Sequence, residues 1–151
     1  MTIEIIPMCA EHLDHIWQIE QQAHSHPWAE SLIRDLSSRG ACHHVMRDGD
    51  EIIGYFYAQN SGGEVTLLNI AVKPSKQGLG YGQKLLDAFL GHCQQVKAES
   101  AWLEVRESNV SALHIYEQAG FHELDRRYNY YPANSGNGKE DAIIMSYMFF
   151  H

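Results

Sequence analysis

Residues 65–82 read VTLLNIAVKPSKQGLGYG, an apolar run that leads into the glycine-rich segment 77–82. The run 65–72 is typical of a buried strand. The residues after the glycines are apolar at the spacing of one helix face, at Leu85, Leu86, Phe89, Leu90 and Cys93. A strand, a glycine turn and a helix start bring unpaired N–H groups and the positive end of a helix dipole to one point. The stretch therefore predicts a phosphate-binding loop.

The glycine spacing does not fit two common phosphate loops. A mononucleotide loop, G-x-x-x-x-G-K-[ST], needs a glycine at Gln83 and a hydroxyl at Leu85. A dinucleotide loop, G-x-G-x-x-G, needs its third glycine at one of these same two positions. The pattern that fits is Q-x-x-G-x-G, formed by Gln77, Gly80 and Gly82. The alternative is an ordinary glycine-rich turn before a helix.

The order of predicted elements is mixed α/β. We expect strands over residues 2–6, 42–47, 52–59, 65–72, 101–105, 121–128 and 142–149. We expect helices over residues 9–24, 30–36 and 109–118 and directly after Gly82, with turns at 48–50 and 61–63 and a polar loop over 132–141. No repeat or interdomain linker interrupts the chain. With 44% hydrophobic residues, residues 1–151 are expected to form one domain.

Composition limits the partners. The net charge is −8, from 11 basic and 19 acidic residues, which disfavours nucleic-acid binding. It suits a basic protein or peptide partner, or simply solubility. There is no apolar run of about 18 residues, no secretory signal and no CxxC among the three cysteines, so we expect reduced thiols in a cytoplasm and no membrane partner. The pairs His24-x-His26 and His43-His44 lack a zinc-site pattern, so no metal is expected.

The glycine loop and the element order together resemble the GCN5-related N-acetyltransferases (GNAT), whose acetyl-CoA pyrophosphate loop has the pattern Q-x-x-G-x-G. Four stretches are similar to a bacterial subgroup, the ribosomal-protein alanine acetyltransferases. They lie within residues 23–28, 69–72, 102–109 and 130–142. The resemblance implies a single-domain α/β fold, in which a mixed, mostly antiparallel sheet splays at the acetyl-CoA strand and is flanked by about four helices.

The resemblance also implies how acetyl-CoA is bound. The backbone of Ile70, Ala71 and Val72 would hold the pantetheine arm, and an N–H near Ile70 or Ala71 would face the acetyl carbonyl. The phosphates would lie on the loop formed by Gln77, Gly78, Leu79, Gly80, Tyr81, Gly82 and Gln83. Asn109 is a good helix N-cap, and the family also uses this position to bond the pantetheine arm.

Acetyl transfer to an amine needs a base and an acid. Glu104 lies inside the apolar run 101–105, where a carboxylate is costly unless it is solvated or partnered. It is a general base, a solvent-facing residue or a partner of Arg106, and the resemblance favours the base. Tyr116 is a core aromatic residue or, as the resemblance implies, the acid that protonates the departing thiolate.

The acceptor is less well defined by the sequence. Trp28, Tyr130 and Tyr131 would flank the acceptor groove, or are surface and edge-strand aromatics. At pH 7 an α-amine is about 10% unprotonated and a lysine about 0.04%, which permits an α-amine acceptor without excluding lysine. The resemblance implies the N-terminal alanine of a small-subunit ribosomal protein, acetylated by direct attack in a ternary complex. The alternatives are a lysine or small-amine acetyltransferase and a non-catalytic acyl-CoA sensor, and the oligomeric state stays open.

Overall fold

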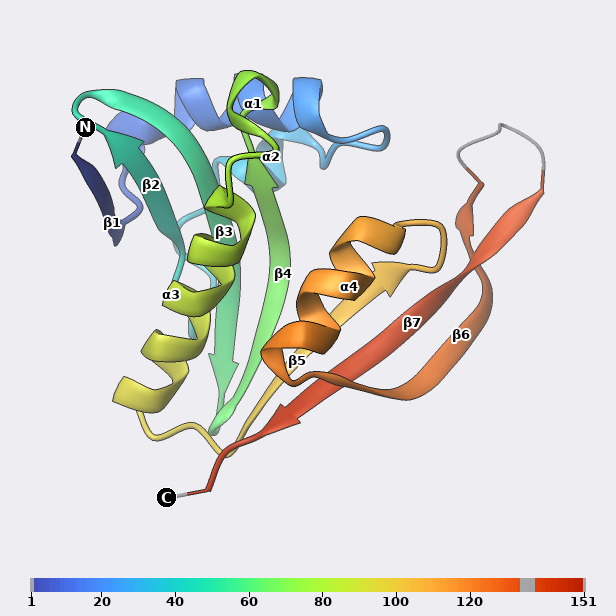
Figure 1. Ribbon diagram of the computed structural model, residues 1–151. Coiled ribbons are helices and arrows are strands. Elements are labelled where there is room, and N and C mark those ends of the chain that lie inside the picture. The colour runs from blue at the N-terminus through green and yellow to red at the C-terminus, as the bar shows by residue number, and fades with distance from the viewer. Residues whose placement is uncertain (1, 134–137, 151) are drawn as a thin grey trace.

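A computed structural model describes residues 2–133 and 138–150 of the chain (Figure 1). The strands are β1 Ile3–Pro7, β2 His44–Asp48, β3 Glu51–Ser61, β4 Glu64–Val72, β5 Ser100–Arg106, β6 His122–Pro132 and β7 Lys139–Met148. The α-helices are α1 Leu13–Ala23, α2 Glu30–Ile33, α3 Tyr81–Gln95 and α4 Val110–Ala119. The seven strands form one sheet in the order β1-β2-β3-β4-β5-β7-β6, in which only β4 and β5 pair in parallel. The expected mixed, mostly antiparallel α/β fold is confirmed.

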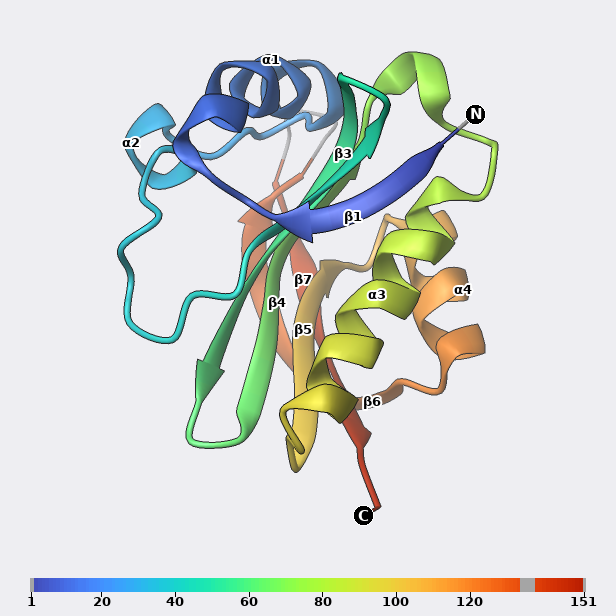
Figure 2. The same cartoon turned by 90° about the vertical axis from the view of Figure 1, so that its left-hand side faces the viewer.

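The helices cover both faces of the sheet, with α1 and α2 on one face and α3 and α4 on the other (Figure 2). On the α3 face, Leu85 and Phe89 are fully buried against the sheet, as their helical spacing predicts. On the α1 face, Ile16 and Ile33 pack against Tyr55. None of the helices in the described ranges is long and apolar enough to cross a membrane.

A β-bulge changes the direction of the side chains along β4. Tyr57 of β3 pairs with Asn69, but the next residue, Ala58, pairs with Leu67, so Leu68 is the extra residue of β4. Side chains alternate between the faces of a sheet with a period of two, so one extra residue moves every later side chain to the opposite face. Before the bulge, the buried side chains of β4 pack on the α3 face; beyond it, Asn69 reaches α1 instead.

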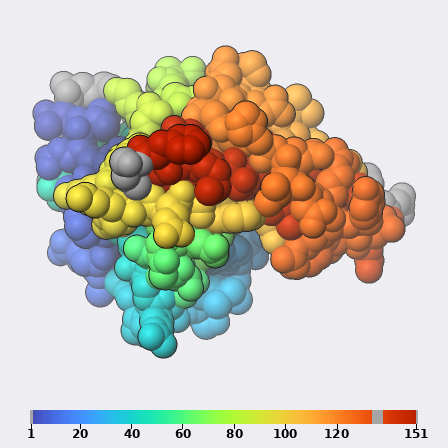
Figure 3. Space-filling view, turned by 90° about the horizontal axis from the view of Figure 1, so that it is seen from below, coloured from blue at the N-terminus to red at the C-terminus, as the bar shows by residue number. Residues whose placement is uncertain are grey.

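Strands β4 and β5 diverge beyond the bulge, which produces the V-shaped opening seen in Figure 1. Their parallel pairing ends at Leu67 and Leu103. At the closed end of the opening, where β4 and β5 begin, the Glu99 N–H donates to the Gly63 carbonyl (2.8 Å). Figure 3 shows the turns that precede these two strands next to the C-terminal residues. The sheet is therefore splayed at the strand that the resemblance implied.

The C-terminal hairpin is longer than predicted. β6 continues to Pro132 and β7 begins at Lys139, so both ends of the loop expected over residues 132–141 are strand; residues 134–137 lie outside the described residues. Nearly every side chain of β6 is exposed, so no apolar alternation marked its extension beyond residue 128. A register shift between Arg127 and Tyr131, with Asn129 at φ 53°, further masks the period of two.

Helix α2 is shorter than the range 30–36 predicted for it and ends at Ile33. Just beyond it, the Asp35 carboxylate accepts hydrogen bonds from the N–H and the hydroxyl of Ser37 (2.9 and 2.8 Å). Such a local turn competes with helix continuation. The chain then continues to β2.

Candidate active site

A cleft of ≈ 650 Å³ lies beside β4, between the glycine loop and α4. Most residues that the resemblance assigned to acetyl-CoA line it, namely Ile70, Ala71, Val72, Gln77, Gly78, Gly80, Tyr81, Gly82, Gln83 and Asn109. Leu79 does not line this cleft, and its side chain is exposed. The side chain of Tyr81 is buried in the core, so Tyr81 presents mainly its backbone to the cleft. We call this space the cofactor cleft.

Two helices begin at the cofactor cleft. Gly80 is the N-cap of α3 and has φ 86°, and Gly78 has φ 78°; both lie in the left-handed region that favours glycine. The N–H groups of Gly82 and Gln83 belong to the first turn of α3, where an α-helix offers them no carbonyl partner of its own. At the start of α4, Asn109 Oδ1 accepts the Ala112 N–H (3.3 Å). The expected N-cap is confirmed, and the cleft holds two sets of helix-start donors.

The edge of β4 supplies backbone groups to the same cleft. The N–H of Lys73 donates to a carbonyl of β3 (2.8 Å). Backbone groups of successive residues point to opposite sides of a strand, so those of Ala71 also face β3, and those of Ile70 and Val72 face the cleft. The Val72 carbonyl accepts the Gln77 side-chain amide (3.0 Å), which ties the glycine loop to the strand. The alternation thus favours Ile70 over Ala71 as the N–H that points into the cleft.

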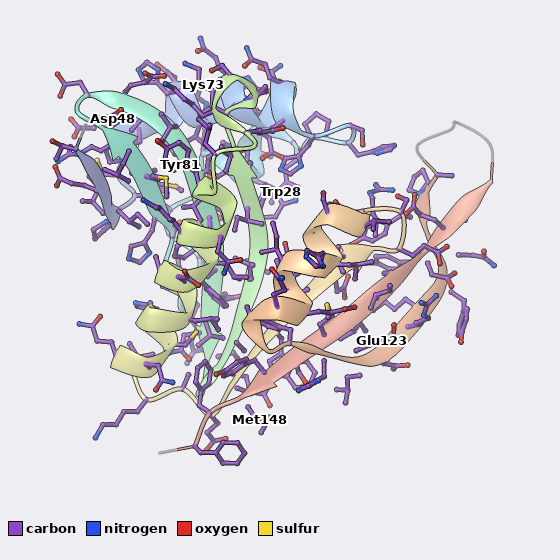
Figure 4. The ribbon with its side chains drawn as sticks, in the orientation of Figure 1. Trp28, Asp48, Lys73, Tyr81, Glu123 and Met148 are labelled. Atoms are coloured by element: carbon purple, nitrogen blue, oxygen red, sulfur yellow. The ribbon has the colours of Figure 1, made fainter. Side chains whose placement is uncertain are left out.

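A second cleft, of ≈ 390 Å³, lies between the diverging strands, and we call it the acceptor cleft. Trp28, Glu104, Tyr116 and Tyr131 line it. Trp28 lies on the open side of β4, on the loop after α1 (Figure 4). Tyr130 does not line the acceptor cleft; its exposed ring packs against Tyr131, with centroids 5.0 Å apart.

The two clefts meet. Four residues, His24, Ile70, Asn109 and Tyr116, line both of them. The last three were singled out from the sequence, whereas His24 was named there only as part of a histidine pair that lacks a zinc-site pattern. A molecule in the cofactor cleft can therefore reach one in the acceptor cleft at this junction.

Glu104 projects from β5, and its side chain is 32% exposed. Its ionic partner is Arg127 of β6 (3.2 Å), not Arg106 as the alternative interpretation supposed. Arg106 instead donates to the Pro132 carbonyl (2.7 Å) and lies over the ring of Tyr131 (4.3 Å). A pair this exposed contributes little to stability. Glu104 is thus a solvated, ionic carboxylate at the wall of the acceptor cleft.

Two tyrosines of the acceptor cleft hold their protons tightly. Burial raises the pKa of Tyr116 to about 12, so its phenol is protonated throughout the neutral range. Burial also raises the pKa of Tyr131, and the negative charge of Glu104 acts in the same direction. Tyr116 therefore carries its proton at the junction of the two clefts.

A buried carboxylate supports the junction, and the sequence interpretation did not assign it to the site. Glu20 of α1 is fully buried and accepts hydrogen bonds from Tyr55 Oη (2.7 Å), Asn69 Nδ2 (2.8 Å) and the Trp28 N–H (3.0 Å). Asn69 Oδ1 lies 2.9 Å from His24 Nε2. The sequence feature that could have identified Glu20 is its place on the apolar face of a helix, because a carboxylate buried there must find hydrogen-bond donors.

Comparison with known proteins assigns the chain and its fold to a family. Residues 10–121 match the family model described as Acetyltransferase (GNAT) family. A ribosomal protein bS18-alanine N-acetyltransferase of Haemophilus influenzae is 39% identical over 133 residues, which cover 88% of this chain and 90% of that protein.

Solved structures show the same relationship. The ribosomal-protein-S18-alanine N-acetyltransferase from Escherichia coli superposes with a TM-score of 0.90 at 34% identity, covering 96% of this chain and 92% of that one. A GNAT family acetyltransferase from Elizabethkingia anophelis with acetyl-CoA bound shares the fold, with a TM-score of 0.81 at 22% identity over 97% of this chain and 98% of that one. The chain therefore belongs to the GNAT family of acetyltransferases.

Proposed function

We propose that this chain transfers the acetyl group of acetyl-CoA to the α-amine of the N-terminal alanine of a protein, with a small-subunit ribosomal protein as acceptor. The meeting of the two clefts at Tyr116 and Ile70 carries the proposal, because it gives two substrates one point of contact. The similarity to the ribosomal protein alanine acetyltransferases supports the choice of acceptor. We take residues 1–151 as one catalytic domain that needs no metal.

The cofactor cleft suits an extended thioester with a phosphorylated end. The N–H groups of Gly82 and Gln83 in the first turn of α3 would bind the pyrophosphate, since they lie at the positive end of the helix dipole. The free edge of β4 would pair with the amides of the pantetheine arm. The N–H of Ile70 would then stabilise the oxyanion that forms on the acetyl carbonyl. Asn109 would bond the same arm while it caps α4.

The chemistry would be direct attack in the ternary complex. Glu104 acts as general base, directly or through water, and frees the lone pair of the amine. The nitrogen attacks the acetyl carbon, and the tetrahedral intermediate collapses with cleavage of the C–S bond. Tyr116 gives its proton to the departing sulfur, a role for which its raised pKa suits it. The rings of Trp28 and Tyr131 would flank the acceptor backbone, with Tyr130 at the outer rim.

The cellular setting follows from the same features. The net charge of −8 suits a basic acceptor rather than a nucleic acid. All three cysteines are free, and none lines either cleft, so no cysteine serves as an acyl carrier. Free thiols also support a cytoplasmic location.

The test is mass spectrometry of a peptide that begins Ala-Arg and contains an internal lysine, incubated with acetyl-CoA and the protein. We expect modification of the α-amine alone. The matched control is the same peptide with a blocked N-terminus, which should stay unmodified. Acetylation of the lysine would contradict the proposed acceptor, and acetyl-CoA binding without turnover on either peptide would indicate a sensor.

A further inference from the structure

The proton balance of the proposed reaction leaves one step without a group to perform it. An α-ammonium must lose one proton before its nitrogen can attack, and the nitrogen of the tetrahedral intermediate must lose a second before it becomes an amide. Tyr116 returns a proton to sulfur, not to nitrogen. Glu104 accepts only one proton per turnover. The site therefore has use for a second proton acceptor near the reacting nitrogen.

His24 lies where that acceptor is needed. It is the one titratable residue besides Tyr116 that lines both clefts among the described residues, so it borders the point where amine and thioester meet. It follows the last turn of α1, where its N–H donates to the Glu20 carbonyl (3.2 Å). Its side chain is 32% exposed, which leaves a path for protons to solvent.

Its hydrogen bonds define the tautomer of the ring. The carboxylate of Glu20 can only accept, so Asn69 must turn its Nδ2 toward Glu20 (2.8 Å). Asn69 Oδ1 is then fixed as the atom that faces His24 Nε2 (2.9 Å), and an amide oxygen can only accept. Nε2 therefore carries the proton of the neutral ring. Nδ1 is left as the basic nitrogen, and the described residues give it no hydrogen-bond partner.

The same contacts can also be made by the protonated ring, because Nε2 carries a proton in both forms. Glu20 Oε1 lies 3.6 Å from His24 Nε2, and Glu20 is fully buried, where a charge is weakly screened. The other charged or titratable side chains that share a cleft lining with His24 are His26 on its own loop, Glu104 and Arg106 of β5, Tyr116 of α4, Tyr131 of β6, and Lys76 and Tyr81 beside the glycine loop. Among the described residues, none of these other side chains forms an ion pair with His24; Glu20 does.

We propose that His24 is a second proton acceptor of the acetyl transfer, held in its reactive tautomer by Asn69 and Glu20. This inference rests on the proposed function. After the nitrogen has attacked, Nδ1 of His24 takes the proton from the cationic nitrogen of the tetrahedral intermediate. The N–H bond breaks, its electrons remain on nitrogen, and the ring becomes imidazolium. The imidazolium then gives the proton to solvent while Tyr116 protonates the sulfur.

Kinetics of His24→Ala on the Ala-Arg peptide test this role. We expect kcat to fall by on the order of 10²-fold, with the KM for peptide and the Kd for acetyl-CoA changed less than threefold. Added imidazole should restore part of kcat, because it can enter the space left by the ring and accept the proton. The matched control is His15→Ala. His15 is an exposed histidine of α1, the helix that His24 follows, and it lines neither cleft, so this variant should keep the wild-type kcat.

His24→Gln separates the base from the hydrogen bond, because its amide can still donate to Asn69 but cannot accept a proton. We expect low kcat and no rescue by imidazole, with an unchanged thermal melting temperature. Wild-type kcat in either variant, or loss of kcat in His24→Ala that imidazole does not restore, would overturn the proposal. If the wild type acetylates lysine instead, the acceptor is wrong, and the same variants still decide the role of His24, since a lysine amine also loses two protons.

Discussion

Glu104 shows what a single side chain contributes and how much of its role the sequence indicates. A carboxylate within an apolar run stands out in the sequence as an anomaly, because such a group needs solvent or a partner. Its partner does not stand out in the same way: Arg127 lies 23 positions further along the chain and on another strand, and the sequence instead suggests Arg106. Local patterns thus indicate the functional side chain but not its long-range contact.

At the residue scale we predict that Glu104→Gln lowers kcat by on the order of 10²-fold, because the amide cannot accept a proton. The Kd for acetyl-CoA should not change, since Glu104 does not line the cofactor cleft. Stopped-flow or steady-state kinetics with calorimetric titration would measure both. Glu107→Gln is the control: Glu107 pairs with Arg126 (3.2 Å) and lines neither cleft, and its variant should behave as wild type. Equal kcat in the two variants would remove Glu104 from the base role.

Local sequence patterns could not predict the hydrogen-bond network of Glu20, Asn69 and His24. Glu20 and Asn69 are 49 positions apart, and they meet because the bulge at Leu68 turns Asn69 toward α1. No pattern of two or 3.6 residues encodes a one-residue insertion in a strand. The side chains on each element could be predicted, but the face on which Asn69 lies could not.

Helices and strands that depend on short-range sequence signals were predicted better than those that depend on distant partner strands. The strand, glycine loop and helix over residues 65–95 were predicted correctly, because the glycines at positive φ and the helical apolar spacing are both short-range signals. The far end of the β6–β7 hairpin was not predicted, because the side chains of β6 are nearly all exposed and give no apolar pattern to follow. The divergence of β4 from β5 was implied by family resemblance alone.

At the element scale, Gly82→Ala should separate stability from cofactor binding. Gly82 lies in the first turn of α3, and no protein atom lies within 4 Å of an added Cβ. We expect an equal or higher free energy of unfolding, by up to about 1 kcal/mol, from helix propensity. We expect the Kd for acetyl-CoA to rise about tenfold, which is about 1.4 kcal/mol, because the methyl group would meet the phosphates.

Gly91→Ala is the matched change within the same helix. Its added Cβ also meets no atom within 4 Å, and Gly91 does not line the cofactor cleft. It should stabilise the helix similarly and leave acetyl-CoA affinity unchanged, as read by urea denaturation and calorimetry. If both variants bind acetyl-CoA as tightly as wild type, the start of α3 is not the phosphate site.

At the scale of the whole molecule, the core on the α3 face should make stability sensitive to alkali. Burial raises the pKa of Cys93 from 9.0, and that of Tyr116 from 10.0, to about 12 in each case. Both groups are neutral below these values, and the unfolded chain ionises first as pH rises. The contribution of these two groups to the free energy of unfolding should therefore be constant up to about pH 9 and fall as pH rises toward 12, by up to about 1.4 kcal/mol per pH unit for each group.

Urea denaturation at pH 8, 10 and 11 would measure this loss. Tyr116→Phe should show a smaller difference between pH 8 and 11 than the wild type, because one of the titrating groups is gone. A wild-type free energy of unfolding that is the same at pH 8 and 11 would mean that these groups are not held neutral by the core.

The joined clefts are proposed to acetylate an α-amine, and an intact acceptor protein offers that amine in competition with lysines. The measurement is mapping of acetyl groups by tandem mass spectrometry on a small-subunit ribosomal protein with a free N-terminal alanine, after incubation with acetyl-CoA and the wild-type chain. Every lysine of that basic protein competes with one α-amine. We predict a single acetyl group on the N-terminal alanine. Acetyl groups on lysines, or none while acetyl-CoA binds, would contradict the assignment.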